Sequence, residues 1–414
     1  MLKNSYSRVN RLFRFSVIGL LAIAISSPAI AVTVETNLPK SDVNKFVRRL
    51  ENADFPKHSG VTLVNLASGT TLHQQLGDHP FVPASTMKLV TAAVALKTFG
   101  PNYKFTTEAT WNKTNHNLYL VGGGDPALRT QHLEVLADGI VTSLGEQTHK
   151  INLYTDATLF PKFTNPKGWK PSPMPRYVRE IYSLSIDGLG SFNAPEIVGK
   201  KLAKILKTRG YKVQYMGAKK SDGTQIATTN GYFLFSIIRK MLQDSDNTIA
   251  ETLFRASASA AGIRPTWENS RTYAMQVLTE LQIDTENIEL IDGSGLSRAN
   301  RLTTHFLTGL LMKIVDETQP ELNVIYDRRL LSTAGRNGTL KLRFSESRDL
   351  CARGSVHAKT GSLSDTDALA GFVENENGSI GVFAFLVNHG KNWYVGNKVR
   401  HSMDWIVSSI TGCN

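Results

Sequence analysis

Apolar residues recur along the chain with two different periods, and these periods predict where strands and helices form. Near both ends apolar and polar residues alternate, first over 61–66 and 70–74 around the turn Ala67-Ser68-Gly69, and again over 368–373 and 381–387. Alternation of this kind predicts strands. Between the ends, apolar residues recur every three to four positions, which predicts helices. The expected helices cover 42–53, 86–98, 195–209, 232–242, 248–261, 268–281, 303–316 and 395–411.

This order of elements predicts an α/β (α+β) fold. Strands at both ends with helices between them indicate one mixed, antiparallel-type sheet that both termini complete, with helices on both sides. A hairpin is expected over 105–111 and 117–121, and the glycine-rich break Gly122-Gly123-Gly124-Asp125-Pro126 follows it. The next stretch is rich in Pro, Gly and Lys. We therefore expect a discontinuous main domain, residues 32–121 and 230–414, with a smaller domain inserted at 122–229.

The first 31 residues are expected to lie outside this fold. Basic residues from Lys3 to Arg14 precede an apolar stretch from Phe15 to about Ser26, and the small residues of Pro28-Ala29-Ile30-Ala31 follow. This is the pattern of a secretory signal peptide that is cut after Ala31. A membrane anchor is the alternative, but the apolar run is shorter than the roughly 20 residues that span a bilayer. We expect a soluble, periplasmic mature chain.

The charge and the cysteines narrow the choice of partners and cofactors. The chain has 47 Lys and Arg against 35 Asp and Glu, with a formal net charge of +12. In an exported protein no nucleic acid partner is expected, and the excess fits either solubility or peripheral attraction to an anionic wall or membrane surface. Cys351 and Cys413 show no metal-binding spacing, so neither a metal nor another cofactor is expected. Whether these two cysteines form a disulfide stays open.

Three short motifs carry the candidate chemistry. They are Ser85-Thr86-Met87-Lys88, Ser245-Asp246-Asn247 and Lys359-Thr360-Gly361, in this order. Each motif taken alone also fits a structural role, as a helix cap, a capping turn or a strand end. Their joint occurrence, each in a suitable local context, favours catalysis by a serine nucleophile. The glycines at 122–124 do not fit a nucleotide-binding loop, because no GK[ST] follows them.

Ser85 and Lys88 are the expected nucleophile and base. Ser85 stands where a helix begins, so backbone N–H groups and the helix dipole favour negative charge near its oxygen. Lys88 lies three residues further along, over the same helical face. A serine hydroxyl needs a base, and a lysine can serve when burial or a nearby positive charge keeps it neutral. Lys359 is a candidate for that second charge.

The other two motifs supply the remaining groups. Ser245 can relay a proton between Lys88 and the leaving amine, and Asn247 can bind the substrate backbone or hold Lys88. On an expected edge strand Lys359 and Thr360 can hold a carboxylate, and Gly361 allows close approach of the substrate. The backbone N–H groups of Ser85 and Ser362 are the expected oxyanion hole. The catalytic set is Ser85, Lys88, Ser245, Asn247 and Lys359, and the substrate-binding set is Asp246, Thr360, Gly361 and Ser362.

The three motifs resemble those of the serine penicillin-binding proteins and serine β-lactamases. The long separation of Ser85 from Ser245 resembles the low-molecular-mass class C penicillin-binding proteins, the D-Ala-D-Ala carboxypeptidase/endopeptidase family of penicillin-binding protein 4 type. The resemblance covers nearly the whole mature chain. It rests further on Ser245-Asp246-Asn247-Thr248-Ile249-Ala250-Glu251, Asp292-Gly293-Ser294-Gly295-Leu296-Ser297-Arg298 and His357-Ala358-Lys359-Thr360-Gly361-Ser362-Leu363.

The resemblance implies a β-lactamase/transpeptidase-like domain, peptidoglycan stem peptides as substrates and β-lactams as covalent inhibitors. Two features depart from the family. The insert is short, since Leu184-Ser185-Ile186-Asp187-Gly188 runs almost directly into the helix at Pro195, so a third domain of the family is expected to be absent or reduced to a loop. The acidic pair Asp365 and Asp367 after the third motif is also unusual.

Two alternatives remain. A serine β-lactamase needs a deacylating base, such as the glutamate of an E-x-x-L-N stretch, and Glu286-Asn287-Ile288-Glu289-Leu290 has the wrong order. A catalytically silent cell-wall-binding protein would not need three intact motifs. The sequence does not separate carboxypeptidase from endopeptidase activity.

Overall fold

The structure is a computed structural model that describes residues 37–53, 56, 58–146, 150–169, 177–186, 193–390 and 393–412. The expected signal peptide and Cys413 lie outside the described residues. Cys351 is disulfide-bonded. In the part of the chain that is described, no helix has both the length and the apolar character needed to cross a membrane.

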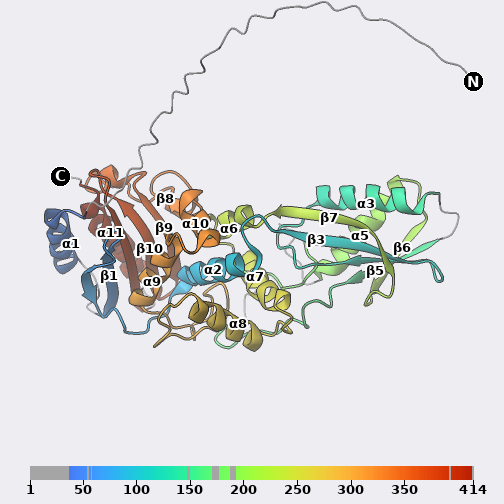
Figure 1. Ribbon diagram of the computed structural model, residues 1–414, viewed down its shortest axis with the longest axis horizontal. Helices are drawn as coiled ribbons and strands as arrows, with labels where there is room; N and C mark the ends of the chain where they lie inside the picture. Colours follow the sequence, from blue (N-terminus) through green and yellow to red (C-terminus); the bar gives the residue numbers. More distant parts are fainter. Residues whose placement is uncertain are drawn as a thin grey trace, which may run out of the picture. The chain divides into compact units, whose positions relative to one another are not determined.

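The described residues form two sheets, and the first brings strands from the early and the late part of the chain together (Figure 1). Its strand order is β2-β1-β11-β10-β9-β8, and every neighbouring pair is antiparallel. The expectation that strands from both ends complete one sheet is therefore confirmed. The strands are β1 (Ser59–Asn65), β2 (Thr71–Gln75), β8 (Ser332–Thr333), β9 (Val356–Leu363), β10 (Thr366–Glu374) and β11 (Ile380–Asn388).

Helices cover both faces of this sheet. Successive side chains of a strand point to opposite faces, so neighbouring apolar residues of one strand pack in different cores. Leu369 of β10 packs in a core with Phe46 of α1 and Val399 of α11. Its neighbour Ala370 packs on the other side, in a second core that further helices line. The helices are α1 (Lys40–Asn52) and α11 (Trp393–Ser408) on one face, and α2 (Lys88–Phe99), α6 (Leu234–Gln243), α7 (Asn247–Ala260), α8 (Trp267–Glu280), α9 (Thr304–Ile314) and α10 (Pro320–Asp327) in the other core.

The second sheet has the order β6-β5-β4-β3-β7, and the helices α3 and α5 pack against it around a separate apolar core. The pairs β4–β5 and β5–β6 are parallel, whereas β3 pairs antiparallel with both β4 and β7. The elements are β3 (Lys104–Asn112), β4 (Asn117–Val121), α3 (Thr130–Leu144), β5 (Ile151–Asp156), α5 (Ala194–Thr208), β6 (Val213–Ala218) and β7 (Thr224–Phe233).

One assignment from the sequence is corrected here. We placed the hairpin at 105–121 in the main domain, but its strands β3 and β4 belong to the second sheet. The reason is that β4 finds its partner in β5 and β3 in β7, and both partners lie later in the chain. The boundaries of the inserted domain otherwise stay a prediction.

Candidate active site

Ser85 lies in a short 3-10 turn, η1 (Ala84–Met87), that leads directly into α2. The helix was expected to begin at Thr86, and the tighter turn displaces its first residue to Lys88. Ala84 holds a φ of +46°, a conformation that costs energy in a residue with a Cβ. Gly295 packs on this turn so closely that a Cβ on it would lie 1.8 Å from the Ala84 carbonyl oxygen. Close packing therefore holds the half-buried Ser85 and its strained turn in one conformation.

Lys88 is fully buried and its Nζ contacts three oxygens. Ser85 Oγ lies at 2.8 Å, Asn247 Oδ1 at 2.7 Å and the Ser294 carbonyl oxygen at 2.8 Å. The carbonyl can only accept a hydrogen bond. Asn247 also presents an acceptor, because its Nδ2 donates to the Tyr177 carbonyl at 2.7 Å. A neutral Lys88 amine would give its two N–H groups to these acceptors and turn its lone pair toward the Ser85 hydroxyl.

The environment of Lys88 favours that neutral form. Burial lowers the pKa of Lys88 to about 8, against the raising effect of the nearby carboxylates Glu251, Asp292 and Asp246. A lysine with a pKa in this range holds a useful fraction of free amine near neutral pH, which a general base requires.

Ser245 lies in the turn between α6 and α7 that the sequence indicated, and Asn247 is the first residue of α7. Ser245 has a φ of +57°, and its Oγ accepts a hydrogen bond from Lys359 Nζ at 3.0 Å. Asp246, which we assigned to substrate binding, accepts a hydrogen bond from the Ile249 backbone N–H at 2.9 Å. It therefore caps the N-terminus of α7, which fixes the positions of its two neighbours.

Lys359 is fully buried on β9, and its Nζ also donates to the Thr360 carbonyl at 2.8 Å. Burial, and next the positive charge of Lys88, lower the pKa of Lys359 well below its ordinary value. The structure thus brings two buried lysines into electrostatic contact, each hydrogen-bonded to one of the motif serines.

The strand β9 runs beside the Ser85 turn. A Cβ on Gly361 would lie 3.1 Å from the Ser85 backbone nitrogen and 2.8 Å from the Pro83 carbonyl oxygen, so only glycine fits this approach. The Val356 carbonyl accepts from Ala334 on the outer side of β9. In an antiparallel strand the backbone N–H and C=O groups of successive residues point to alternate sides. Because β9 has no register shift, the N–H of Ser362, six residues after Val356, points to that same outer side.

This outer side is an edge at the third motif. The two-residue strand β8 pairs only with His357 and Ala358, and among the described strands nothing pairs with β9 beyond them on that side. The Thr360 side chain is half-buried there, and its Oγ1 donates to Thr339 Oγ1 at 2.7 Å. Thr339 belongs to the short turn η2 (Gly338–Leu340). The expected edge strand is therefore present, and beyond Ala358 no described strand occupies the outer side of β9, where an extended peptide can pair.

Sequence reasoning assigned no role to a buried acidic pair beneath the lysine. Glu251 of α7 is fully buried, and its carboxylate accepts the backbone N–H groups of Gly293 at 3.0 Å and Ser294 at 2.8 Å. Burial, together with the neighbouring Asp292, raises the pKa of Glu251 to about 8. Glu251 ends the stretch that begins at Ser245, and Asp292 begins the DGSGLSR stretch that ends at Arg298. Both stretches stand out in the sequence, but residue type alone does not distinguish a buried carboxylate from one at the surface.

Asp292 folds the loop that follows it. Its oxygens accept from the backbone N–H groups of Gly295 at 2.8 Å and Ser297 at 2.7 Å, and from the Trp169 indole at 2.6 Å. The result is a rigid loop that aims the Ser294 carbonyl at Lys88. Within the described ranges, no group of three or more His, Cys, Asp or Glu side chains is placed to hold a metal ion.

The chain is similar to several known proteins over most of its length. A carboxypeptidase DacB of Mycolicibacterium smegmatis is 28% identical over 95% of this chain and 87% of that protein. A D-alanyl-D-alanine carboxypeptidase of an Actinomadura species is 26% identical over 80% of this chain and 78% of its own length. The crystal structure of penicillin binding protein 4 from Haemophilus influenzae superposes with a TM-score of 0.69 at 20% identity, covering 87% of this chain and 98% of that one, which shows a shared fold.

The model of one protein family matches most of the chain, over residues 46–188 and 188–410. Both segments together contain all three motifs and both sheets. The chain belongs to the D-Ala-D-Ala carboxypeptidase 3 (S13) family.

Proposed function

We propose that this protein is a serine DD-peptidase that cleaves D-Ala-D-Ala termini, D-Ala cross-links of peptidoglycan, or both, through an acyl-enzyme on Ser85. The observation that carries the proposal is the contact of the buried Lys88 Nζ with Ser85 Oγ at 2.8 Å, beside two groups that only accept hydrogen bonds. Those two acceptors direct the lone pair of the neutral amine at the hydroxyl proton. Family membership supplies the substrate class.

In the first half-reaction Ser85 Oγ attacks the carbonyl carbon of the penultimate D-Ala, and its proton passes to Lys88. The carbonyl oxygen gains negative charge, which the N–H groups of Ser85 and Ser362 stabilise. The C–N bond then breaks, and the leaving amine takes a proton by way of Ser245. Lys359, hydrogen-bonded to Ser245 at 3.0 Å, keeps that hydroxyl oriented.

In the second half-reaction water attacks the ester carbon. Lys88 accepts a proton from the water, the C–O bond of the ester breaks, and Ser85 regains its proton. A β-lactam forms the same ester when its ring opens, but its leaving group stays attached, so deacylation is slow. The Haemophilus influenzae protein that shares this fold is named for penicillin binding.

Covalent labelling tests the nucleophile. The wild-type protein is expected to bind a fluorescent penicillin and to release D-Ala from a pentapeptide, and Ser85→Ala is expected to do neither. Ser68→Ala, at an exposed turn of the β1–β2 hairpin, is the matched control and should keep both properties. Labelling of Ser85→Ala at the wild-type level would show that another residue is the nucleophile.

The same assays separate the two alternatives. A serine β-lactamase would turn over nitrocefin quickly and release little D-Ala. A silent wall-binding protein would remain unlabelled while it sediments with isolated peptidoglycan. Both alternatives predict an outcome opposite to the one that we expect.

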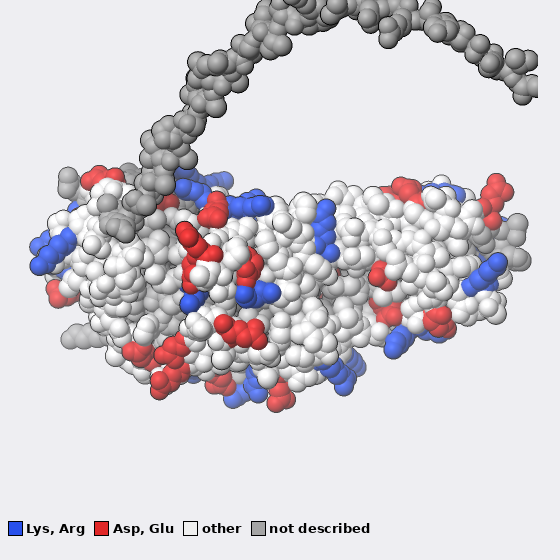
Figure 2. All heavy atoms as spheres, in the orientation of Figure 1, with Lys and Arg blue, Asp and Glu red and all other residues white. Residues whose placement is uncertain are grey.

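We also propose that the chain is exported to the periplasm and cut after Ala31. The basic residues before Phe15 and the small residues up to Ala31 support this proposal. The basic excess would further allow weak attraction to an anionic wall or membrane surface, although Figure 2 shows acidic and basic side chains interspersed over the face in view. Finding Met1 still present on the protein purified from the periplasm would contradict the cleavage.

A further inference from the structure

A second polar cluster lies behind the active-site strand, on the face of the first sheet that α11 covers. Asp367 of β10 stands directly opposite Ser362 of β9, and a side-chain hydrogen bond joins the two. His389 Nε2 lies 2.9 Å from one carboxylate oxygen of Asp367, and Arg400 Nε lies 3.1 Å from the other. The Asp367 and His389 side chains are each only 2% exposed.

The Asp367–His389 contact is a buried hydrogen bond between an imidazole nitrogen and a carboxyl oxygen. His389 Nδ1 lies 2.8 Å from the Gly390 carbonyl, which only accepts, so Nδ1 carries a hydrogen. The contact of Nε2 with Asp367 then needs a proton of its own, on the imidazole or on the carboxyl. The Arg400 guanidinium on the far side favours the carboxylate form of Asp367. His389, Arg400 and Ser362 are the titratable or polar groups that face Asp367 from the elements packed against it.

The helix α11 is built to cover this pair. A Cβ on Gly396 would lie 2.9 Å from Asp367 Oδ2 and 3.1 Å from His389 Cε1, so glycine permits the contact. Arg400 lies one turn further along the same helix and donates to the Gly396 carbonyl. Burial raises the pKa of Asp367, and Arg400, His389 and Ser362 oppose this effect. Burying the Asp367 carboxyl group costs free energy unless its three partners contact it.

The turn between β9 and β10 is fixed from two further directions. Arg298 forms a two-pronged ion pair with Asp365, at 3.1 Å and 3.0 Å. The His389 backbone N–H donates to the Asp365 carbonyl at 3.0 Å. The end of β9 that carries the Ser362 N–H is therefore tied to the DGSGLSR loop on one side and to the His389 segment on the other.

We propose that Asp367 is a positioning residue of the peptidase reaction, which acts by holding Ser362 so that its backbone N–H stays aimed at the oxyanion. This inference rests on the proposed function. His389 and Arg400 hold the Asp367 carboxylate, and α11 closes the cluster from solvent. A strand end that is free to shift would still bind the peptide but would stabilise the tetrahedral intermediate less.

Steady-state kinetics of D-Ala release and the rate constant of penicillin acylation test the inference. Asp367→Asn removes the charge that orders the cluster. We expect kcat and the acylation rate to fall roughly tenfold, with little change in KM. This loss is smaller than the loss caused by removing an oxyanion-hole donor completely. Ser362→Ala keeps the N–H and removes only the tether at an exposed position. It should change kcat in the same direction, and the double variant should equal Asp367→Asn alone.

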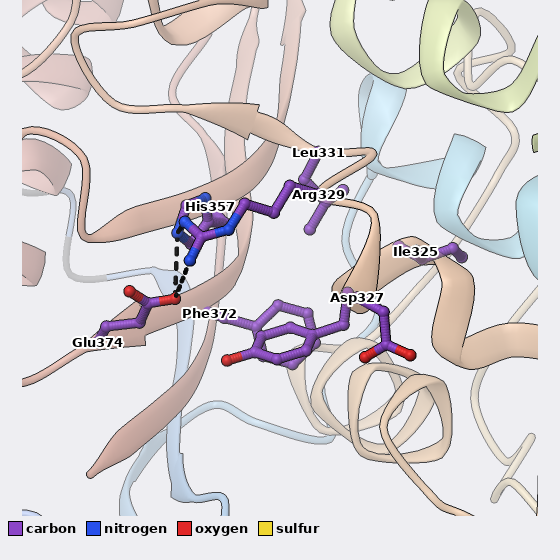
Figure 3. A pocket seen from close by; sticks show the side chains of 8 residues that line it. Ile325, Asp327, Arg329, Leu331, His357, Phe372 and Glu374 are labelled. Atoms are coloured by element: carbon purple, nitrogen blue, oxygen red, sulfur yellow. Dashed lines mark hydrogen bonds and ion pairs between the residues drawn. The ribbon is translucent and has the colours of Figure 1, made fainter. Parts of the chain in front are cut away.

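A matched control exists at the other end of β10. Glu374 also pairs with a histidine and an arginine, His357 at 3.2 Å and Arg329 at 3.5 Å, in the pocket of Figure 3. It does not lie opposite the Ser362 N–H, so Glu374→Gln should keep the wild-type kcat. Additive effects of the two cluster variants, or a wild-type kcat in folded Asp367→Asn, would overturn the positioning role while leaving the peptidase intact. A wild-type protein that neither labels nor releases D-Ala would overturn the proposed function, and this inference with it.

Discussion

The carbonyl oxygen of Ser294 accepts a hydrogen bond from Lys88 at 2.8 Å, and this contact ties the lysine to a loop more than two hundred positions away in the chain. The carbonyl is placed by Glu251, which holds the N–H groups of Gly293 and Ser294. The Thr91 hydroxyl of α2 donates to the Gly293 carbonyl at 2.6 Å from the other side. The geometry at Ser85 therefore depends on buried groups that do not touch the nucleophile.

Glu251→Gln should slow acylation without abolishing binding. An amide at this position accepts only one of the two N–H groups and faces the other with its own NH₂. A buried donor left without an acceptor costs about 1–3 kcal/mol. We expect a roughly tenfold or larger loss in acylation rate, since about 1.4 kcal/mol corresponds to a factor of ten, together with a lower Tm.

The control for this variant is Glu268→Gln on α8, whose side chain is 77% exposed. It should acylate at the wild-type rate and melt at the wild-type temperature. Stopped-flow acylation with a chromogenic β-lactam and thermal unfolding supply both measurements. An unchanged acylation rate in Glu251→Gln would mean that the loop does not set the position of Lys88.

The acylation rate should rise with pH through a value near 8. Lys88 has its pKa lowered to about 8, and only its neutral form can accept the Ser85 proton. The neutral fraction grows as pH rises through the pKa, so the rate should climb between about pH 6 and pH 8 and level off above about pH 9. A pH profile of the second-order acylation constant tests this, and a rate that falls over the same interval would exclude Lys88 as the base.

Gly295→Ala should disable the site through a backbone clash. The residue has a φ of +83°, and the new Cβ would lie 1.8 Å from the Ala84 carbonyl oxygen. The Ser85 turn would have to move, so we expect acylation to fall by more than about a hundredfold, the order of loss that a misplaced catalytic group produces.

Gly378→Ala separates the clash from the backbone strain. Gly378 has a φ of +87°, but nothing lies within 4 Å of the position that its Cβ would take. That variant should lose only about 1–2 kcal/mol of stability and keep its acylation rate. If both variants acylated equally well, the contact between the DGSGLSR loop and the nucleophile turn would have no catalytic role.

The elements of the main fold could be predicted because their signals are local. The periodicity of 248–261 predicts α7 to within a residue at each end, and alternation at 381–387 predicts β11. The sheet that receives the hairpin at 105–121 could not be predicted, because period-two alternation is the same whichever strand becomes the partner. The motifs indicated Ser85, Lys88 and Ser245 by residue type. The Ser294 carbonyl and the buried state of Glu251 arise only from tertiary packing, so no sequence pattern marks them.

Thr360→Val should weaken the binding of substrates that end in a free carboxylate. The Thr360 hydroxyl lies on the free edge of β9, where a terminal carboxylate can replace its present acceptor, Thr339 Oγ1 at 2.7 Å. A hydrogen bond to a charged group contributes about 1.5–3 kcal/mol, so KM for a D-Ala-D-Ala pentapeptide should rise roughly tenfold or more. A cross-linked dimer whose acceptor nitrogen is the side-chain amine of lysine has no carboxylate next to the scissile bond, and its KM should change less.

The neighbouring hydroxyl provides the control for this last variant. Thr339 is exposed, so Thr339→Val removes the present acceptor without burying a new group and leaves the Thr360 donor free. Its KM for the pentapeptide should not rise. Steady-state assays of both variants on both substrates therefore report whether Thr360 reads the terminal carboxylate. An equal rise in KM for the pentapeptide and the cross-linked dimer in Thr360→Val would instead assign the hydroxyl to holding β9 in place, with no preference for the carboxypeptidase reaction.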